Sequence, residues 1–216
     1  MSKFNTKIAG AIAGCLLTLL ALGLVLYHAT PHCSFSSPHS ESNVCAEELV
    51  EICPGAFKSI SSVVRGGNVY TSSMMCPWRK PTYMIGIFSL SLTQILMILF
   101  AFQLAGKALK IPMTVLASII LPMLLVACAL MVKDITDGYD YSRENPGAYK
   151  FLQQSYLINL GLVFASVFVV GWAVRTGFML SDAIGKKQYN EIHELQSPKS
   201  VDENVENQQE QIEIAV

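Results

Sequence analysis

The amino-acid sequence predicts an all-α membrane protein, a four-transmembrane-helix bundle that carries a small disulfide-stapled, β-rich extracellular loop domain. Three observations predict it. Of the 216 residues, 52% are hydrophobic and 14% are charged, whereas a soluble domain is about one quarter charged. The apolar residues gather in four blocks, each close to the roughly 20 residues that cross a bilayer. Four of the six cysteines lie between the first two blocks.

Composition and motifs exclude two broad classes of function. So apolar a chain is not a soluble enzyme, and a net charge of −1 gives no support to nucleic-acid binding. The chain carries no nucleophile elbow, P-loop or H-E-x-x-H sequence. We therefore expect neither catalysis nor a bound cofactor.

Each apolar block is expected to form a transmembrane helix, because only helices and closed barrels satisfy their own backbone hydrogen bonds in lipid. The alternation of a barrel strand is absent, and the cores of the blocks contain no charged residue or histidine. A cleaved signal peptide is the alternative for the first block, but its apolar stretch is too long and no A-x-A site follows it. The predicted spans are residues 8–28, 83–106, 111–132 and 152–175.

The charges beside the helices predict the orientation. The short turn 107–110 contains two lysines and no acid, whereas the longer loop 133–151 mixes its basic residues with Asp134, Asp137, Asp140 and Glu144. Because positive short loops face the cytoplasm, residues 1–7 and the tail 176–216 are placed there. The loops 29–82 and 133–151 are then extracellular in a plasma-membrane protein.

Cysteine usage in the first loop agrees with that orientation. An even set of cysteines confined to one exposed loop is typical of an oxidising compartment; the alternative is reduced cytosolic thiols. A loop of this size has too small a core to fold alone, and each disulfide adds roughly 2–4 kcal/mol. Three pairings are open for the four cysteines, Cys33, Cys45, Cys53 and Cys76.

The same loop contains a hairpin signal. Two β-rich runs, 62–65 and 68–71, flank Gly66-Gly67, and a type I′ turn needs positive φ at both central residues. A flexible glycine tip is the alternative, and residues 46–52 fit either a strand or one helical turn. Irregularly spaced histidines near Cys33 raise a metal site as an alternative to structural or solvated histidines. They are His28, His32 and His39.

Small residues predict close helix contacts. Gly10 and Gly14 form a G-x-x-x-G pair in the first span, and Gly161 with Ala165 repeats the spacing in the fourth. Such pairs let helix backbones approach closely in lipid. We expect them to pack helices within the chain, with homo-oligomerisation as the alternative.

Polar side chains inside the spans are expected to hydrogen-bond across helices. A more specific alternative is that Gln94 and Asn159 line a path for a solute through the bundle. Pumps and voltage sensors usually carry ionisable groups within the membrane, and the cores of these spans contain no charged residue or histidine.

The tail after Ser197-Pro198 is rich in Glu, Gln and Asn, a composition typical of disorder. Residues Tyr189 to Ile192 fit Y-x-x-Φ, which endocytic adaptors read in an extended conformation. The final residues, Ile214 and Val216, fit the Φ-x-Φ form of a class II PDZ ligand, which binds by strand addition to a PDZ scaffold.

Four spans, cytoplasmic ends and a long first extracellular loop resemble the superfamily of claudins and calcium-channel γ subunits. Its first-loop signature is a Trp, then Gly-Leu-Trp-x-x-Cys, then a second Cys. Residues 48–53 are similar: Leu49 and Cys53 keep their places, while Glu48 and Val50 replace Gly and Trp. No Trp precedes this segment, and Cys76 follows at a longer spacing. The resemblance implies a Cys53–Cys76 disulfide, which leaves Cys33–Cys45. It also implies a left-handed bundle beneath an antiparallel sheet.

These expectations lead to a functional hypothesis. The chain is expected to be a non-enzymatic accessory (auxiliary) subunit that modulates an ion channel or receptor, its assembly or its trafficking. The alternative is a claudin-like cell-junction or adhesion protein whose tail binds a PDZ scaffold.

Overall fold

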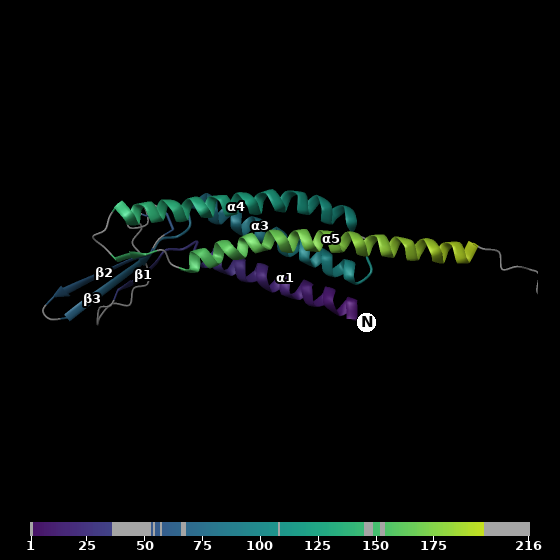
Figure 1. Ribbon diagram of the computed structural model, residues 1–216, viewed down its shortest axis with the longest axis horizontal. Coiled ribbons are helices and arrows are strands. Elements are labelled where there is room, and N and C mark those ends of the chain that lie inside the picture. The colour runs from purple at the N-terminus through teal and green to yellow at the C-terminus, as the bar shows by residue number, and fades with distance from the viewer. Residues whose placement is uncertain are drawn as a thin grey trace, which may run out of the picture.

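A computed structural model describes residues 2–35, 53, 55–56, 58–65, 68–107, 109–144, 149–151 and 154–196. It contains four long helices packed side by side, with a small sheet at one end (Figure 1). All four are long and apolar enough to cross a membrane, with mean hydropathies between 2.2 and 2.8. The spans are Asn5–Tyr27, Lys80–Leu104, Lys110–Tyr141 and Gln154–Lys187. The prediction of a four-helix, multi-pass membrane protein is therefore supported.

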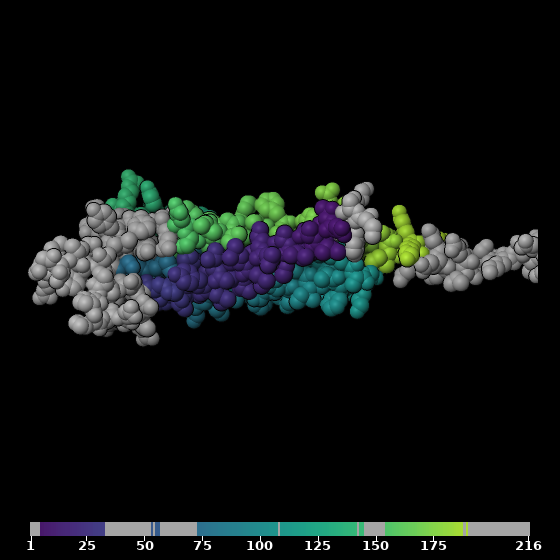
Figure 2. Space-filling model, turned by 90° about the horizontal axis from the view of Figure 1, so that it is seen from below, coloured from purple at the N-terminus to yellow at the C-terminus, as the bar shows by residue number. Residues whose placement is uncertain are grey.

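The helices form a ring with one diagonal contact. Helix α1 (Ser2–Tyr27) packs against α3 (Lys80–Leu104) and α5 (Gln154–Gln196), and α4 (Lys110–Glu144) also packs against both α3 and α5. Helices α3 and α5 touch across the middle. Figure 2 shows α1 on one face of the bundle, between α5 and α3. The beginning of α1 and the end of α5 lie at the same end of the bundle, opposite the sheet (Figure 1).

Helix α4 is longer than the predicted span. It continues through Pro122 and extends twelve residues beyond residue 132, into the segment expected to be the second loop. It ends at Glu144, just before Asn145-Pro146, because the residue that precedes a proline disfavours the α conformation. The charged residues after Val132 thus extend the helix instead of forming a loop.

Helix α5 is also longer than predicted, and it continues well beyond residue 175 to Gln196. The Nζ of Lys110 lies 3.2 Å from Asp182 Oδ1 and 5.1 Å from the centre of the Phe178 ring. An exposed pair of this kind contributes little stability by itself, but it joins the beginning of α4 to the extension of α5. The first part of the tail is therefore helical as far as Gln196, and the part predicted to be disordered, after Ser197-Pro198, lies outside the described residues.

Four strands form one antiparallel sheet in the order β1-β3-β2-β4. Strands β1 (His32–Phe35), β2 (Lys58–Arg65) and β3 (Asn68–Met75) come from the segment between α1 and α3. Arg65 pairs with Asn68, which leaves residues 66 and 67 between the paired strands. The segment 46–52 lies outside the described residues.

The fourth strand comes from a distant part of the chain. Strand β4 (Tyr149–Phe151) lies between α4 and α5 in sequence and pairs with β2, with Ile60 opposite Tyr149. The sequence analysis predicted no strand there, because three residues are too few for a periodic pattern. The sheet therefore joins both segments that connect helices at this end of the bundle.

The turn between α3 and α4 depends on one glycine. Gly106 has φ of +94°, and the N–H groups of Gly106 and Lys107 donate to the carbonyls of Gln103 and Phe102 at 3.0 and 3.2 Å. This is a Schellman motif, in which a left-handed residue satisfies the last helical carbonyls.

We expect Gly106→Ala to lower the free energy of unfolding by about 1 kcal/mol, because a Cβ is disfavoured in left-handed backbone. No described atom lies within 4 Å of the added Cβ, so steric contact does not contribute. Gly23→Ala is the matched control, with equally open space and no positive φ. Thermal unfolding in mild detergent measures both; equal effects of the two variants would contradict the prediction.

Candidate functional site

Backbone contacts fix the first connecting segment on helix α4. The N–H of Ala56 donates to the carbonyl of Asp134 at 2.9 Å. A Cβ added to Gly55 would overlap that carbonyl oxygen, and one added to Gly138 would lie 2.7 Å from the carbonyl oxygen of Ala56. Both glycines are therefore required by close approach. We call this contact, together with the ion pairs of Arg79 described next, the loop clasp.

Ion pairs complete the loop clasp. The backbone N–H of Arg79, the N-cap residue of α3, donates to Asp134 Oδ2 at 3.0 Å. The guanidinium lies 3.7 Å from Asp134 Oδ1 through Nε and 2.6 Å from Asp137 Oδ2 through Nη1. Asp134 is only 2% exposed, and a buried carboxylate needs such partners to remain charged. One arginine thus joins the start of α3 to the extension of α4.

A disulfide lies next to the loop clasp. Cys53 is bonded to Cys76, with their Cα atoms 5.7 Å apart, which agrees with the pairing that the resemblance implies. Cys33 is on β1, and Cys45 lies outside the described residues, so the other expected pair does too. Cys15 and Cys128, within α1 and α4, are free thiols.

An aromatic cluster lies beneath the sheet. We define it as His28, Trp78 and Tyr156, whose side chains are at most 1% exposed. The rings of His28 and Tyr156 stack with centroids 4.5 Å apart, and Trp78 meets Tyr156 edge-on at 5.1 Å. The Tyr156 hydroxyl donates to the carbonyl of Cys76, and the backbone N–H of Trp78 donates to the carbonyl of His28 at 2.8 Å. The cluster joins α1, the disulfide and α5.

The histidines of the first segment have structural contacts in this arrangement. The ring of His32 stacks on Tyr27 at 4.3 Å, and its Nε2 is 2.9 Å from the Tyr27 carbonyl. In the described part of the chain no group of three or more His, Cys, Asp or Glu could hold a metal ion. The third histidine of that hypothesis, His39, lies outside the described residues.

The pKa of His28 predicts a pH dependence of stability. Burial, and then the neighbouring His32, lower the pKa of His28 to about 4. His28 is protonated near pH 6.5 in the unfolded chain but only near pH 4 in the folded chain. The unfolded state therefore binds more protons between these values, and the folded state loses stability as the pH falls from 6.5 to 4. The loss should reach up to about 1.4 kcal/mol per pH unit.

Thermal unfolding in detergent between pH 7 and 4 tests this, with His28→Gln as the comparison. The variant should lose less stability on acidification than the unaltered chain. If the variant and the unaltered chain lose stability equally as the pH falls, His28 is not responsible for the pH dependence.

Polar side chains inside the bundle bond across helices. Gln94 Nε2 donates to Thr18 Oγ1 at 2.7 Å, which joins α3 to α1. Gln103 Nε2 donates to the carbonyl of Gly177 at 3.0 Å, which joins α3 to α5. Asn159 is fully buried, and its amide atoms have no hydrogen-bond partner among the described residues. Gln94 is therefore used in helix packing, and no described contact connects it to Asn159.

The G-x-x-x-G pair of α1 packs against α5, as predicted. A Cβ on Gly10 would lie 2.7 Å from the Trp172 ring, and one on Gly14 would lie 2.9 Å from Val169. The prediction that Gly161 packs against another helix of the same chain is wrong: it is exposed, and no described atom lies within 4 Å of its added Cβ. Gly161 shares a helix face with Phe168 and Trp172, but in the described part of the chain no other helix approaches this face at the level of Gly161. Ala165, one turn further along, is half-buried.

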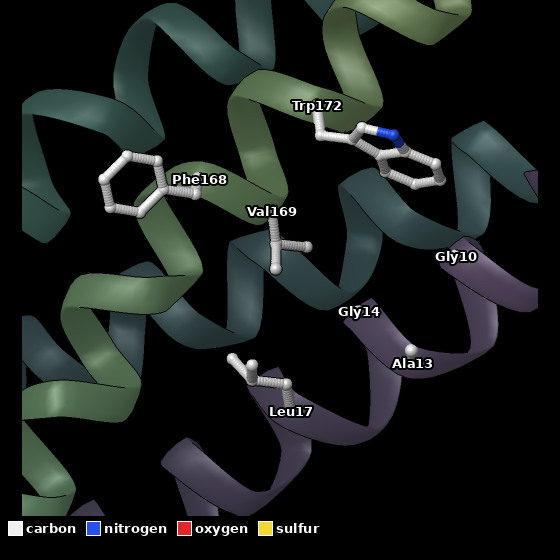
Figure 3. A pocket seen from close by; sticks show the side chains of 7 residues that line it. All are labelled: Gly10, Ala13, Gly14, Leu17, Phe168, Val169 and Trp172. Atoms are coloured by element: carbon white, nitrogen blue, oxygen red, sulfur yellow. The ribbon is translucent and has the colours of Figure 1, made fainter.

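An apolar groove runs beside this contact (Figure 3). Its volume is about 300 Å³, and the Trp172 ring lies beside Gly10 at one end. It is lined by Gly10, Ala13, Gly14 and Leu17 of α1 and by Phe168, Val169 and Trp172 of α5. We call it the α1–α5 groove.

The two tail motifs have different outcomes. Tyr189 to Ile192 lie within α5, so the motif is helical and not in the extended form that an adaptor reads. Helix ends fray readily, and this motif lies only four residues before Gln196. Ile214 and Val216 lie outside the described residues.

Comparison with known proteins adds no relative. No protein-family model, curated protein or solved structure matches this chain. Functional inference therefore depends on the geometry described above.

The most informative residues of the site were missed by the sequence analysis. Asp134, Asp137 and Gly138 share one helix face, and this spacing was a usable signal had residues 133–144 been interpreted as helix. Trp78, two residues after Cys76, was a second signal, because tryptophan is among the most buried residues on average.

Proposed function

We propose that this chain is a non-enzymatic accessory subunit that associates laterally with an ion channel or receptor in the plasma membrane. Its helices contact the partner within the bilayer, and its disulfide-stapled sheet contacts the partner's extracellular part. Both termini then lie in the cytoplasm. The claudin and γ-subunit resemblance belongs to this proposal.

The loop clasp is the observation that carries the proposal. Arg79, Asp134 and the Gly55–Gly138 approach attach the sheet-bearing segment to α4 through backbone, ionic and steric contacts. A preorganised surface loses less entropy on binding, so a fixed sheet suits the recognition of a second ectodomain. The same contacts connect the sheet-bearing segment to α3 and α4. A displacement of the sheet by a partner would therefore also displace these two helices, and such coupling is needed to modulate a partner.

The use of polar groups inside the bundle favours this class over a transporter. The side chains of Gln94 and Gln103 are committed to α1 and α5. Interhelical bonds of this kind contribute about 0.6–2 kcal/mol each. These residues therefore stabilise the packing, and opening a path along them would break those bonds.

Affinity purification of the full chain from native membranes in mild detergent tests the proposal. We expect a channel or receptor subunit in stoichiometric amount. Asp134→Asn, which weakens the loop clasp, should reduce recovery of that partner, whereas Lys186→Gln, an exposed site on α5, should not. Expressed alone, the chain should carry no current, and with the partner it should change gating or surface delivery. Recovery of scaffold proteins and itself alone would contradict the proposal.

A junctional or adhesive role is the second candidate. The β2–β3 hairpin projects away from the helices (Figure 1), and Arg65 lies at its far end. A charged tip in this position suits contact with an opposing membrane. If the chain forms a claudin-type pore, reversing Glu47, Glu48, Glu51 or Arg65 should change ion selectivity across a cell layer; unchanged selectivity and adhesion would exclude this role.

A further inference from the structure

We propose that the α1–α5 groove holds an acyl chain of an anionic phospholipid, whose phosphate lies between Lys7 and Arg175. This inference requires only that the chain spans a membrane. It does not depend on the accessory role, and its test can fail independently.

The lining of the groove fits hydrocarbon. Gly10, Ala13 and Gly14 form a floor without long side chains, and Trp172 and Val169 reach toward it from α5 (Figure 3). The exposed Phe168 completes the apolar lining. A volume of about 300 Å³ is at the lower end of small-ligand sites. An apolar cavity of this kind offers water no hydrogen-bond partners, and inside a bilayer lipid is the available filler.

The length of the groove favours a lipid chain over a partner's helix. From Gly10 to Leu17 the groove extends along eight residues of α1, a rise of about 10 Å. This is about one third of the hydrocarbon thickness. A partner helix about 10–12 Å wide would cross the full membrane and need a longer seam. An acyl chain enters from one interface and occupies a single leaflet, as the groove does.

Charge at the mouth of the groove selects the headgroup. Lys7 lies three residues before Gly10, and Arg175 lies three residues after Trp172. Residues at this spacing share a helix face, and α1 and α5 run in opposite directions, so both bases flank the same end of the groove. Neither takes part in an ion pair in the described part of the chain. Basic residues at the interface attract anionic lipids.

Photo-crosslinking in vesicles tests the proposal. The full chain is reconstituted in phosphatidylcholine with a minor fraction of a probe, either phosphatidylserine or phosphatidylcholine, that carries a photoreactive acyl chain. We expect the phosphatidylserine probe to label peptides of α1 and α5 around the groove more strongly than the phosphatidylcholine probe. Labelling should be weaker on the exposed faces of α3 and α4.

Two kinds of variant distinguish binding of the acyl chain from recognition of the lipid headgroup. Ala13→Phe fills the groove from an exposed position and should abolish labelling there, while Ala101→Leu, exposed on α3, should not. Lys7→Gln and Arg175→Gln should each reduce the preference for phosphatidylserine roughly fivefold without abolishing chain labelling. Lys186→Gln, farther along α5, is the charge control. Gel filtration identifies any variant that misfolds, and the surface charge variants remain informative if Ala13→Phe does.

Three results would overturn the inference. Labelling spread evenly over all exposed helix faces would indicate unselective annular lipid. Equal labelling by both probes would remove the role of Lys7 and Arg175. If Ala13→Phe abolishes self-association or partner recovery and leaves lipid labelling intact, the groove holds a protein helix instead.

Discussion

Gly138→Ala is expected to lower the free energy of unfolding by about 2–3 kcal/mol. Alanine is favoured over glycine in a helix by about 1 kcal/mol, so propensity alone predicts the opposite sign. The added Cβ would lie 2.7 Å from the carbonyl oxygen of Ala56, and backbone cannot rotate away as a side chain can. Overpacking costs about 1–3 kcal/mol, and the displaced segment also weakens the Ala56–Asp134 hydrogen bond.

Gly185→Ala is the matched control, because it makes the same substitution in α5 where no described atom lies within 4 Å. It should stabilise the chain slightly. Thermal unfolding followed by gel filtration in mild detergent compares the two, and proteolysis of the first connecting segment reports whether the loop clasp has opened. If both variants are stabilised, the close approach of Gly138 to Ala56 is not a constraint in solution.

Trp78→Ala should produce the largest loss among single substitutions, about 3–5 kcal/mol. The indole is 1% exposed and packs edge-on against the stacked rings of Tyr156 and His28. Its removal leaves a cavity where α1, α5 and the disulfide-bearing segment meet. The backbone bond from Trp78 to the His28 carbonyl is unaffected by the change, so the variant isolates the side chain.

The other tryptophan is the control for this prediction. Trp172 is 36% exposed and borders the α1–α5 groove, so Trp172→Ala should cost less than half as much. Each single variant leaves one tryptophan, whose fluorescence reports its own surroundings during unfolding. Equal losses would show that the aromatic cluster is no more tightly packed than the lipid-facing surface.

The success and failure of the sequence analysis have distinct physical causes. The apolar cores of the spans were correctly located, because one residue type repeated over a bilayer thickness is a strong local signal. The ends of α4 and α5 were not, because a helix can leave the membrane and continue in water, where a run such as residues 133–144 no longer needs to be apolar. The prediction for Gly161 failed for a related reason: the spacing of small residues identifies a helix face but does not show which element, if any, packs against it.

The number and approximate place of the apolar spans, and the contribution of Gly10 and Gly14 to close packing, could be predicted from the sequence alone. All of these follow from local chemistry: hydropathy along a segment and residue size at a fixed helical spacing. The loop clasp, the aromatic cluster and the pairing of β4 with β2 became visible only in the folded chain. Each depends on groups far apart in the chain, such as Arg79 with Asp134 or Cys76 with Tyr156. Their proximity results from how the helices align, and no segment encodes that alone.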